Sequence, residues 1–316
     1  MNFLEKANRK TRALVLMSGG LDSILAVKLL EGQGIETVPV CFESYFFSAA
    51  EARRTAAAVN INLRVEDISH QHLEAVKHPN FGYGTAVNPC IDCHLLMLKT
   101  AKMIMEKEGF DFIATGEVLG ERPMSQNRQS LEIIEKRSGL SGKLLRPLSA
   151  KLLPETTVEA SGLVDREKLF AISGRSRKPQ MEIARNLSIK YFPQPGGGCI
   201  LTETDFGRRL REMMMRHPDF GGADASLLRY GRPVWEESLL FIVARDKVEC
   251  AALRDMSKAG DVVFLPVNFP GPTVLARDFQ NKIPHDRIEK KGKELVLKYS
   301  KKVPENPDIF IKNVQG

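Results

Sequence analysis

Residues 18–23, with the sequence SGGLDS, constrain the fold of this 316-residue chain more than any other segment. An apolar run at residues 13–17 precedes them, and residues 23–34 follow with apolar residues at helical spacing and a glycine stop. The order is therefore strand, glycine-rich loop and helix. Paired glycines let backbone N–H groups converge on an anion, serine hydroxyls add donors, and the helix presents its positive end. These features predict a pyrophosphate-binding loop.

Asp22 is the unusual residue of this loop, because a carboxylate repels phosphate unless a divalent cation bridges the two. It therefore predicts Mg²⁺ held between the aspartate and the phosphates. The loop lacks the lysine of GxxxxGK[ST] and does not match GxGxxG. The structural alternative is a tight strand-to-helix turn with a capping serine.

The sequence after the loop continues to alternate between strand and helix patterns. Apolar runs at residues 36–42, 61–68 and 110–117 predict strands, and alanine-rich or amphipathic segments at 48–60 and 95–109 predict helices. This alternation predicts an α/β fold, a parallel sheet with helices on both faces. From residue 140 to 195 the pattern is less regular, apart from a helix expected around Ala184–Leu187.

The chain changes character near residue 206. A helix is expected over residues 202–218, and short β-rich runs follow at 238–245 and 261–267. We therefore expect two domains, residues 1–206 and a smaller α+β domain at residues 207–316. The second holds 20 Lys and Arg against 15 Asp and Glu, most of the chain's net charge of +7, so polyanion binding is expected mainly there.

The composition excludes several other classes. With 43% hydrophobic residues the chain can bury a sizeable core, which excludes bulk disorder. No stretch approaches the roughly 18 apolar residues of a membrane helix, and the N-terminus lacks the apolar core of a secretory signal. We therefore expect a cytoplasmic protein without a membrane partner. Five cysteines, an odd number, are too few for a disulfide scaffold.

Three of the cysteines form a pattern that suggests a metal site. Cys90 and Cys93 form a CxxC pair before the helix at 95–109, and Cys199 follows three glycines far along the chain. The CxxC pair, expected as a hairpin, holds two thiolates near one metal, and Cys199 would supply a third. Two interpretations stay open: a [4Fe–4S] cluster with one open iron, or a zinc site closed by His94. A Cys90–Cys93 redox pair lacks the thioredoxin context. Cys41 and Cys250 lie in apolar runs typical of core positions.

The SGGxDS loop after the first strand resembles that of the PP-loop ATP pyrophosphatases, enzymes that split ATP into AMP and pyrophosphate. The resemblance implies an adenine nucleotide alpha hydrolase-like fold and ATP as cofactor, with Mg²⁺. It also implies that Phe42 at the end of the second strand lies close to the adenine, and that Thr115 and Gly116 contribute to ATP binding. The loop residues implied to bind ATP are Ser18, Gly19, Gly20, Leu21, Asp22 and Ser23.

Further segments resemble the cluster-dependent tRNA thiolases within this family, which carry CxxC plus a distant cysteine. Residues 115–121 (TGEVLGE), with Ser125-Gln126 after them, and residues 145–148 (LRPL) resemble segments of 4-thiouridine synthetases. The match covers roughly residues 12–202. It implies ATP-dependent sulfur transfer to a tRNA uridine, with a [4Fe–4S] cluster held by Cys90, Cys93 and Cys199. The residues expected to take part in catalysis are Asp22, Asp92, Cys93 and Cys199, Asp92 as an acid or base by its position alone.

The sequence also departs from the standard 4-thiouridine synthetases. Only 17 residues precede the loop, too few for their N-terminal RNA-binding module, and a rhodanese-like domain is not expected after it. We therefore expect the sulfur donor to be free sulfide or a cysteine desulfurase. Contact with tRNA would fall to the C-terminal part, where residues 261–275 weakly resemble a small RNA-binding domain. Its candidate phosphate contacts are Lys290, Lys291, Lys293, Lys298, Lys301 and Lys302.

Other functions compete with sulfur transfer. One is a different PP-loop ligase, amidating or nitrile-forming, with zinc at the cysteines. Another is a non-catalytic RNA-binding protein whose loop is only a scaffold. The chain could also act as a homodimer. Whether O2 or O4 of a uridine is replaced, and at which tRNA position, does not follow from these residues.

Overall fold

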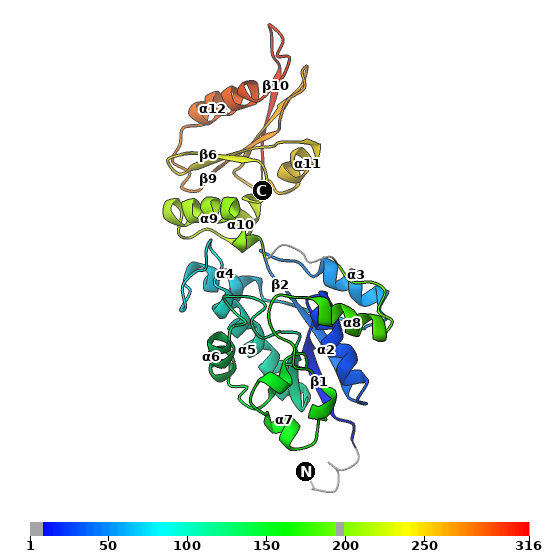
Figure 1. The fold of residues 1–316 in the computed structure, drawn as a ribbon. Coiled ribbons are helices and arrows are strands. Elements are labelled where there is room, and N and C mark those ends of the chain that lie inside the picture. The colour runs from blue at the N-terminus through cyan, green and yellow to red at the C-terminus, as the bar shows by residue number, and fades with distance from the viewer. Residues whose placement is uncertain (1–8, 194–198, 316) are drawn as a thin grey trace. The chain divides into compact units, whose positions relative to one another are not determined.

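The computed structural model describes residues 9–193 and 199–315. The chain divides into two compact units, Met1–Cys199 and Ile200–Gly316. The boundary expected near residue 206 falls inside helix α9 (Thr204–Arg216), which belongs to the second unit. Each unit contains a sheet of its own (Figure 1).

The sheet of the first unit has five parallel strands in the order β3-β2-β1-β4-β5. The strands are β1 (Arg12–Leu16), β2 (Glu36–Glu43), β3 (Arg64–Asp67), β4 (Phe112–Thr115) and β5 (Leu144–Leu145). The chain moves outward from β1 to β3 and then returns to β4 on the other side of β1. Ligands of open α/β sheets bind outside the carboxyl ends of the strands at such a reversal. The four predicted strands overlap β1 to β4.

Helices cover both faces of this sheet, as predicted (Figure 1). On β1, Ala13 and Val15 pack in one apolar cluster with side chains of α2 and α3, whereas Leu14 packs in another with side chains of α5 and α6. This division follows from the two-residue period of a strand. The helices are α2 (Leu21–Glu31), α3 (Ala50–Ala58), α4 (Ser69–Lys77), α5 (Cys90–Glu108) and α6 (Arg128–Ser138).

Helix α5 differs from its prediction at its start. It begins at Cys90 rather than at residue 95, so the CxxC pair forms its first turn and is not a hairpin. Pro89 is the N-cap residue, and Asp92 places a carboxylate in the first turn, where the helix dipole favours negative charge. The helix ends at Gly109, whose φ of 71° is left-handed.

The region from 140 to 195, which showed no regular pattern, contains short elements. They are η1 (Ala150–Leu152), α7 (Thr157–Ala160), η2 (Arg166–Lys168) and α8 (Lys178–Asn186). The helix expected around Ala184 is the end of α8. Residues 194–198, most of the predicted proline- and glycine-rich loop, lie outside the described residues.

The second unit is α+β, as predicted. Its antiparallel sheet has the order β10-β8-β9-β7-β6. Its strands are β6 (Arg232–Glu236), β7 (Leu239–Val243), β8 (Val262–Pro266), β9 (Val274–Asp278) and β10 (Ile309–Asn313). Besides α9, its helices are η3 (Ile200–Thr202), α10 (Gly222–Leu227), α11 (Lys247–Asp255) and α12 (His285–Lys298). In the described part of the chain, no helix combines the length and apolarity needed to cross a membrane.

A buried ion cluster joins elements of the second unit. The Arg277 guanidinium on β9 donates to Asp261 at 2.6 and 2.8 Å and to Asp224 at 2.7 Å. All three side chains are buried. Burial raises the pKa of Asp224, but its hydrogen bonds and the nearby cations outweigh this effect, so the pKa is lower than usual. Such a cluster is stable only while every charge has its partner.

Candidate nucleotide and cysteine site

The phosphate loop lies where the fold predicts a ligand, between the end of β1 and the start of α2. It borders a cavity of about 420 Å³ at the carboxyl ends of the strands. Many residues that the sequence analysis singled out line this cavity, among them Ser18, Gly20, Asp22, Ser23, Cys41, Phe42, His94, Thr115, Gly116 and Cys199. Segments 180 residues apart in the sequence therefore meet at one site.

Two glycines fix the loop by letting backbones approach closely. Gly19 has a φ of 86°, and a Cβ there would lie 2.7 Å from the Cα of Ala52. A Cβ on Gly116 would lie 2.6 Å from both the carbonyl carbon of Asp22 and the amide nitrogen of Ser23. Real Cβ atoms do not approach backbone so closely, so both positions require glycine. The end of β4 thus supports the loop from one side and α3 from the other.

Asp22, in the first turn of α2, has an unpartnered oxygen and a raised pKa. Its Oδ1 atom is buried and has no hydrogen-bond partner among the described residues. Burial raises the pKa of the Asp22 carboxyl, and the nearby Arg177 and Arg122 charges oppose this increase. A buried, unpartnered carboxylate oxygen beside a phosphate loop is a suitable ligand for Mg²⁺. The residues present therefore fit the predicted cation.

Three polar residues near Asp22 were not found from the sequence. Arg122 and Gln126 line the cavity, and the Gln126 Oε1 atom is buried without a partner in the described chain. Arg177, at the N-cap of α8, lies close enough to affect the charge of Asp22. No pattern marked these residues, although Gln126 lies in a segment quoted for its family resemblance.

Part of the cavity lining is apolar. Phe42 and Phe47 line it together with Met97 and Leu98 of α5. An aromatic and aliphatic lining of this kind suits a planar base. Cys41 is also buried, as predicted, and burial raises the pKa of its thiol to about 11. Cys250, expected in a strand, instead lies in helix α11 and is half-buried.

The three patterned cysteines lie in one neighbourhood. Cys90 and Cys93 occupy the first turn of α5, and the Cys90 Sγ accepts a hydrogen bond from Asn88 Nδ2 at 3.2 Å. Burial raises the pKa of the Cys93 thiol well above its ordinary value, and the neighbouring Cys199 and Cys90 raise it further. Cys199 lies 3.9 Å, sulfur to oxygen, from the Phe46 carbonyl.

The donor set of three thiols suits a metal or cluster, but its geometry is not that of a formed site. Within residues 9–193 and 199–315, no group of three His, Cys, Asp or Glu side chains is arranged to hold a metal ion. The three thiols are therefore chemically suited to bind a metal or cluster, whereas the distances between them are not those of a metal site.

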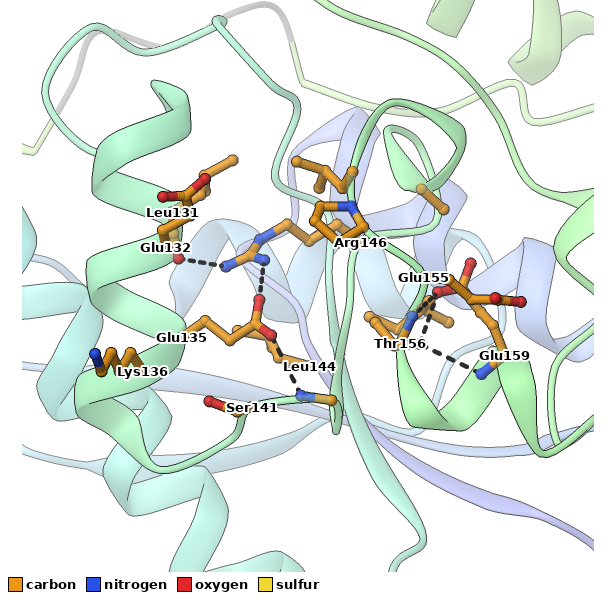
Figure 2. Close-up of a pocket in the computed structure, with 15 residues that line it drawn as sticks. Leu131, Glu132, Glu135, Lys136, Ser141, Leu144, Arg146, Glu155, Thr156 and Glu159 are labelled. Atoms are coloured by element: carbon orange, nitrogen blue, oxygen red, sulfur yellow. Dashed lines mark hydrogen bonds and ion pairs between the residues drawn. The ribbon is translucent and has the colours of Figure 1, made fainter.

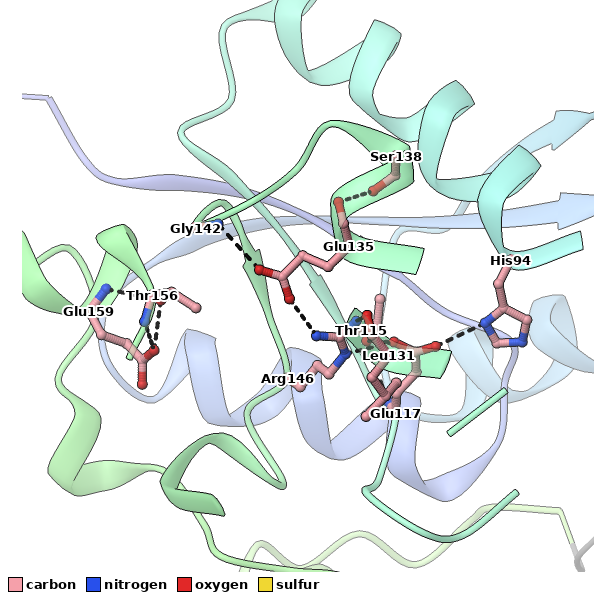
Figure 3. Close-up of polar contacts among 10 residues, drawn as sticks. All are labelled: His94, Thr115, Glu117, Leu131, Glu135, Ser138, Gly142, Arg146, Thr156 and Glu159. Atoms are coloured by element: carbon pink, nitrogen blue, oxygen red, sulfur yellow. Dashed lines mark hydrogen bonds and ion pairs between the residues drawn. The ribbon is translucent and has the colours of Figure 1, made fainter. Parts of the chain in front are cut away.

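A largely buried polar network centres on Glu117 and includes His94, the residue after Cys93 (Figure 3). Glu117 accepts from the Arg146 guanidinium at 3.0 Å and from the Thr115 hydroxyl at 3.1 Å. His94 Nδ1 lies 2.9 Å from the other Glu117 oxygen. Burial alone would raise the pKa of Glu117, but Arg146 and His94 lower it to about 2. Because an ionised carboxylate only accepts, Nδ1 carries the proton.

Asp92 accepts hydrogen bonds from a neighbouring loop. Its Oδ1 accepts from the backbone and side-chain nitrogens of Asn80 at 3.0 and 3.1 Å, and its Oδ2 accepts from the Phe81 amide at 3.1 Å. The carboxylate is buried and does not line the cavity. Through these contacts Asp92 joins residues 80–81 to α5, and its role as an acid or base stays a prediction.

A second cavity, of about 280 Å³, lies on the other side of Arg146 (Figure 2). Arg146 Nη1 donates to Glu135 at 2.9 Å there. Thr156, the N-cap residue of α7, forms a capping box with Glu159. Its principal charged groups are thus already paired, and we assign it no ligand.

The fold and the loop define the class of the first unit: a parallel α/β domain with an anion-binding SGGxDS loop at its switch point. Residues 9–151 match the family model described as thiamine biosynthesis protein (ThiI). The first unit is therefore similar to this family over residues 9–151, and the match supports the resemblance to PP-loop tRNA thiolases seen in the sequence.

Curated relatives agree with this assignment. A protein of Methylobacterium nodulans named tRNA-specific 2-thiouridylase MnmA is 30% identical over 150 residues, which are 40% of this chain and 38% of the relative. The tRNA-specific 2-thiouridylase MnmA 3 of Bacteroides fragilis is 34% identical over 113 residues, 34% of this chain and 31% of the relative. The chain thus spans about a third of the length of the relatives it matches.

One similar solved structure is described as U34-tRNA thiolase NcsA from Methanococcus maripaludis with its [4Fe-4S] cluster. It has 16% sequence identity and a TM-score of 0.32, over 66% of this chain and 67% of that one. A TM-score this low supports no argument about either fold or cluster.

Proposed function

We propose that the chain is an ATP-dependent tRNA sulfurtransferase that replaces a uridine carbonyl oxygen with sulfur. The observation that carries this proposal is the shared cavity, in which the phosphate loop and Cys199 line the same space. An ATP pyrophosphatase needs the loop, and a sulfur carrier or sulfur ligand needs a thiol within reach of the activated atom. The matches to 2-thiouridylases over the first unit support the same reaction class.

The reaction has two balanced steps. The uridine carbonyl oxygen attacks the α-phosphorus of ATP, and pyrophosphate leaves. A sulfur nucleophile then attacks the activated ring carbon, and AMP leaves with the former carbonyl oxygen. With free sulfide as the nucleophile, this step needs no reductant. With a cysteine desulfurase as the donor, the terminal sulfur of a persulfide bonds to the ring carbon. A second thiol then attacks the inner sulfur, which releases the thiocarbonyl and leaves a disulfide.

The chain's own groups serve the first step. Loop amides and the positive end of α2 would hold the phosphates, and Arg122 at the cavity wall would neutralise the leaving pyrophosphate. Asp22 would hold Mg²⁺, which when bound supplies further charge neutralisation. The apolar lining with Phe42 would take a base, and Thr115 and Gly116, which line the same cavity, would contact the nucleotide.

Cys90, Cys93 and Cys199 would ligate the [4Fe–4S] cluster. When bound, a cluster with three protein ligands supplies an open iron for a sulfur atom. Cys93 and Cys199 are the thiols proposed to act in the second step. The zinc alternative would use the same thiols with His94, whose Nδ1 is already oriented by Glu117.

RNA binding is proposed for the second unit, whose lysines gather on and after α12. Lys291 and Lys293 pair with glutamates, whereas Lys290, Lys301 and Lys302 form no ion pair within the described residues. Unpaired, exposed lysines are free to contact phosphates and release counterions.

The test is a tRNA thiolation assay on protein purified without oxygen, with ATP, Mg²⁺ and sulfide. We expect about four irons per chain, with AMP, pyrophosphate and thiouridine in equal amounts. Cys199→Ala should lose iron and thiouridine, whereas Cys250→Ala, a change in the second unit, should retain both. One zinc without iron, together with ammonia-dependent AMP release, would instead identify an amidating or nitrile-forming ligase. Nucleotide-independent RNA binding without AMP release would identify a non-catalytic protein.

A further inference from the structure

The loop that leads into α5 contains a buried asparagine, Asn88, two residues before Cys90. The Gly84 amide donates to the Asn88 carbonyl at 3.0 Å and closes this loop over residues 84–88. A Cβ on Gly84 would lie 2.4 Å from Asn88 Nδ2 and 2.8 Å from its Oδ1. The loop can therefore enclose the side-chain amide only because residue 84 is glycine.

The orientation of the Asn88 amide follows from its own hydrogen bonds. Its Oδ1 accepts from the backbone N–H of Ala86 at 3.2 Å, and that group can only donate. A flipped amide would place two donors against each other, so the other end of the amide is the NH₂ group. Nδ2 lies 3.2 Å from the Cys90 sulfur and donates to it.

This contact distinguishes the Cys90 sulfur from that of Cys199. An amide NH₂ group has no acceptor, so Asn88 holds the Cys90 sulfur as an acceptor, which is the role of a thiolate or of a metal-bound sulfur. The Cys199 sulfur lies 3.9 Å from the Phe46 carbonyl oxygen, which can only accept from a thiol S–H. The surroundings of Cys90 therefore already suit a ligand, whereas this contact of Cys199 suits a thiol.

A hydrogen bond to a ligand sulfur has two consequences for a bound metal. It holds the sulfur in place before the metal arrives, so binding has less to order. It also stabilises negative charge on the sulfur, and this charge is larger when a cluster is reduced. Hydrogen bonds to the sulfurs are among the factors that set the reduction potential of a cluster. A donor at Cys90 should therefore favour both metal binding and reduction.

We propose that Asn88 is a positioning residue for Cys90: its amide holds the sulfur ready as a metal ligand and raises the reduction potential of a bound cluster. The inference rests on the proposed use of Cys90 as a ligand. Two neighbours of Asn88 complete the arrangement. Gly84 leaves room for the amide, and Ala86 fixes which end of it faces the sulfur.

The test measures two properties of the full chain and its Asn88→Ala variant. The first is Co²⁺ binding to the metal-free protein, followed by the sulfur-to-cobalt charge-transfer absorption. It should weaken about tenfold, the effect of one lost hydrogen bond to a charged group. The second is the reduction potential of the reconstituted cluster, followed by electron paramagnetic resonance. At a fixed potential the ratio of reduced to oxidised cluster should fall about threefold, a shift of roughly 30 mV to more negative potential for one electron.

Asn80→Ala is the matched control. Asn80 also joins the loop before α5 to that helix, through Asp92, but it does not contact the Cys90 sulfur. Both Co²⁺ binding and the reduction potential should therefore match those of wild type. Gly84→Ala is a second variant, for the case that Asn88→Ala does not fold. It keeps the amide but displaces Nδ2 from the sulfur, so both properties should change in the same direction as in Asn88→Ala.

Unchanged Co²⁺ binding in the Asn88→Ala variant would overturn the positioning role, and an unchanged potential would overturn the effect on reduction. Equal losses in Asn80→Ala and Asn88→Ala would also overturn the proposal, because the loop as a whole would then be responsible. If wild type binds Co²⁺ through its thiolates but acquires no cluster, the proposed cluster chemistry fails, while the Co²⁺ data still decide the role of Asn88. If wild type binds neither, Cys90 is not a ligand and both proposals fail.

Discussion

Replacing Glu117 with Gln removes the negative charge that lies between Arg146 and His94. The change keeps the size and shape of the side chain but leaves the buried Arg146 guanidinium with Glu135 as its remaining anionic partner. We expect the first unit to lose stability, because a buried charge that loses its partner is not resolvated.

The magnitude follows from the pKa of Glu117, which is lowered from 4.5 to about 2. A carboxyl whose pKa is lower in the folded than in the unfolded chain stabilises the fold at every pH above its unfolded value. That stability is lost as the pH falls through the folded value. At 1.36 kcal/mol per pKa unit, wild type should therefore be more stable than Glu117→Gln by about 3 kcal/mol at pH 7 and by about 2 kcal/mol at pH 3.5.

Urea unfolding of the full chain at pH 7, 5 and 3.5 measures this difference. Far-UV circular dichroism follows both units, whereas fluorescence of the single tryptophan, Trp235 on β6, follows the second unit alone. The fluorescence transition of the second unit should be the same in wild type and variant. The circular dichroism transition of the first unit should move to a lower urea concentration in the variant. Glu132→Gln, an exposed position on the same helix as Glu135, is the matched control.

Two results would refute the reasoning. A loss below 1 kcal/mol at pH 7 would mean that the network contributes no more than an exposed ion pair. If the stability difference between wild type and variant is as large at pH 3.5 as at pH 5, the pKa of Glu117 is not lowered as inferred.

Three further predictions concern the loop, the second unit and RNA. Gly116→Ala should weaken ATP binding at least tenfold by calorimetry, because its Cβ would displace the backbone of Asp22 and Ser23. Arg277→Met should destabilise the second unit by about 3–5 kcal/mol in the Trp235 fluorescence transition, because Asp224 and Asp261 lose their buried partner. Replacing Lys290, Lys301 and Lys302 together with Gln should lower the slope of log K for tRNA binding against log salt by about three.

Each of these has a control within the chain. Gly221→Ala, at a glycine with an ordinary φ and room for a Cβ, should leave ATP binding unchanged. The transition of the first unit should not move in Arg277→Met. Lys291→Gln with Lys293→Gln removes lysines that already have glutamate partners, so the salt slope should change less than in the triple variant. Equal effects of variant and control would contradict the corresponding prediction.

The fold of the first unit could be predicted because its signals are local. The alternation of apolar strands and amphipathic helices gave the parallel sheet, and SGGLDS marked the turn between β1 and α2. The start of α5 was missed because Pro89 and Asp92 define a cap only once the preceding chain is placed. Strand β5 was missed because two residues carry no period.

The candidate site was predicted where a motif carries it and missed where it depends on packing. The loop, Phe42, Gly116 and Cys199 line one cavity, as the resemblance implied. The contacts of Asp92 were not predicted, because its partners Asn80 and Phe81 come from a separate loop. Arg177 is the N-cap residue of α8, a helix whose packing on α2 no local pattern encodes.

The backbone of the phosphate loop lies between two other backbones, that of Ala52 on one side and that of Gly116 on the other. A loop enclosed in this way has few conformations available before a nucleotide arrives, so binding removes little conformational entropy. Its amide hydrogens should already exchange slowly with solvent in the free protein, and nucleotide association should be limited by diffusion rather than by loop ordering. The chain thus orders this site once, during folding, instead of repeating that step in every turnover.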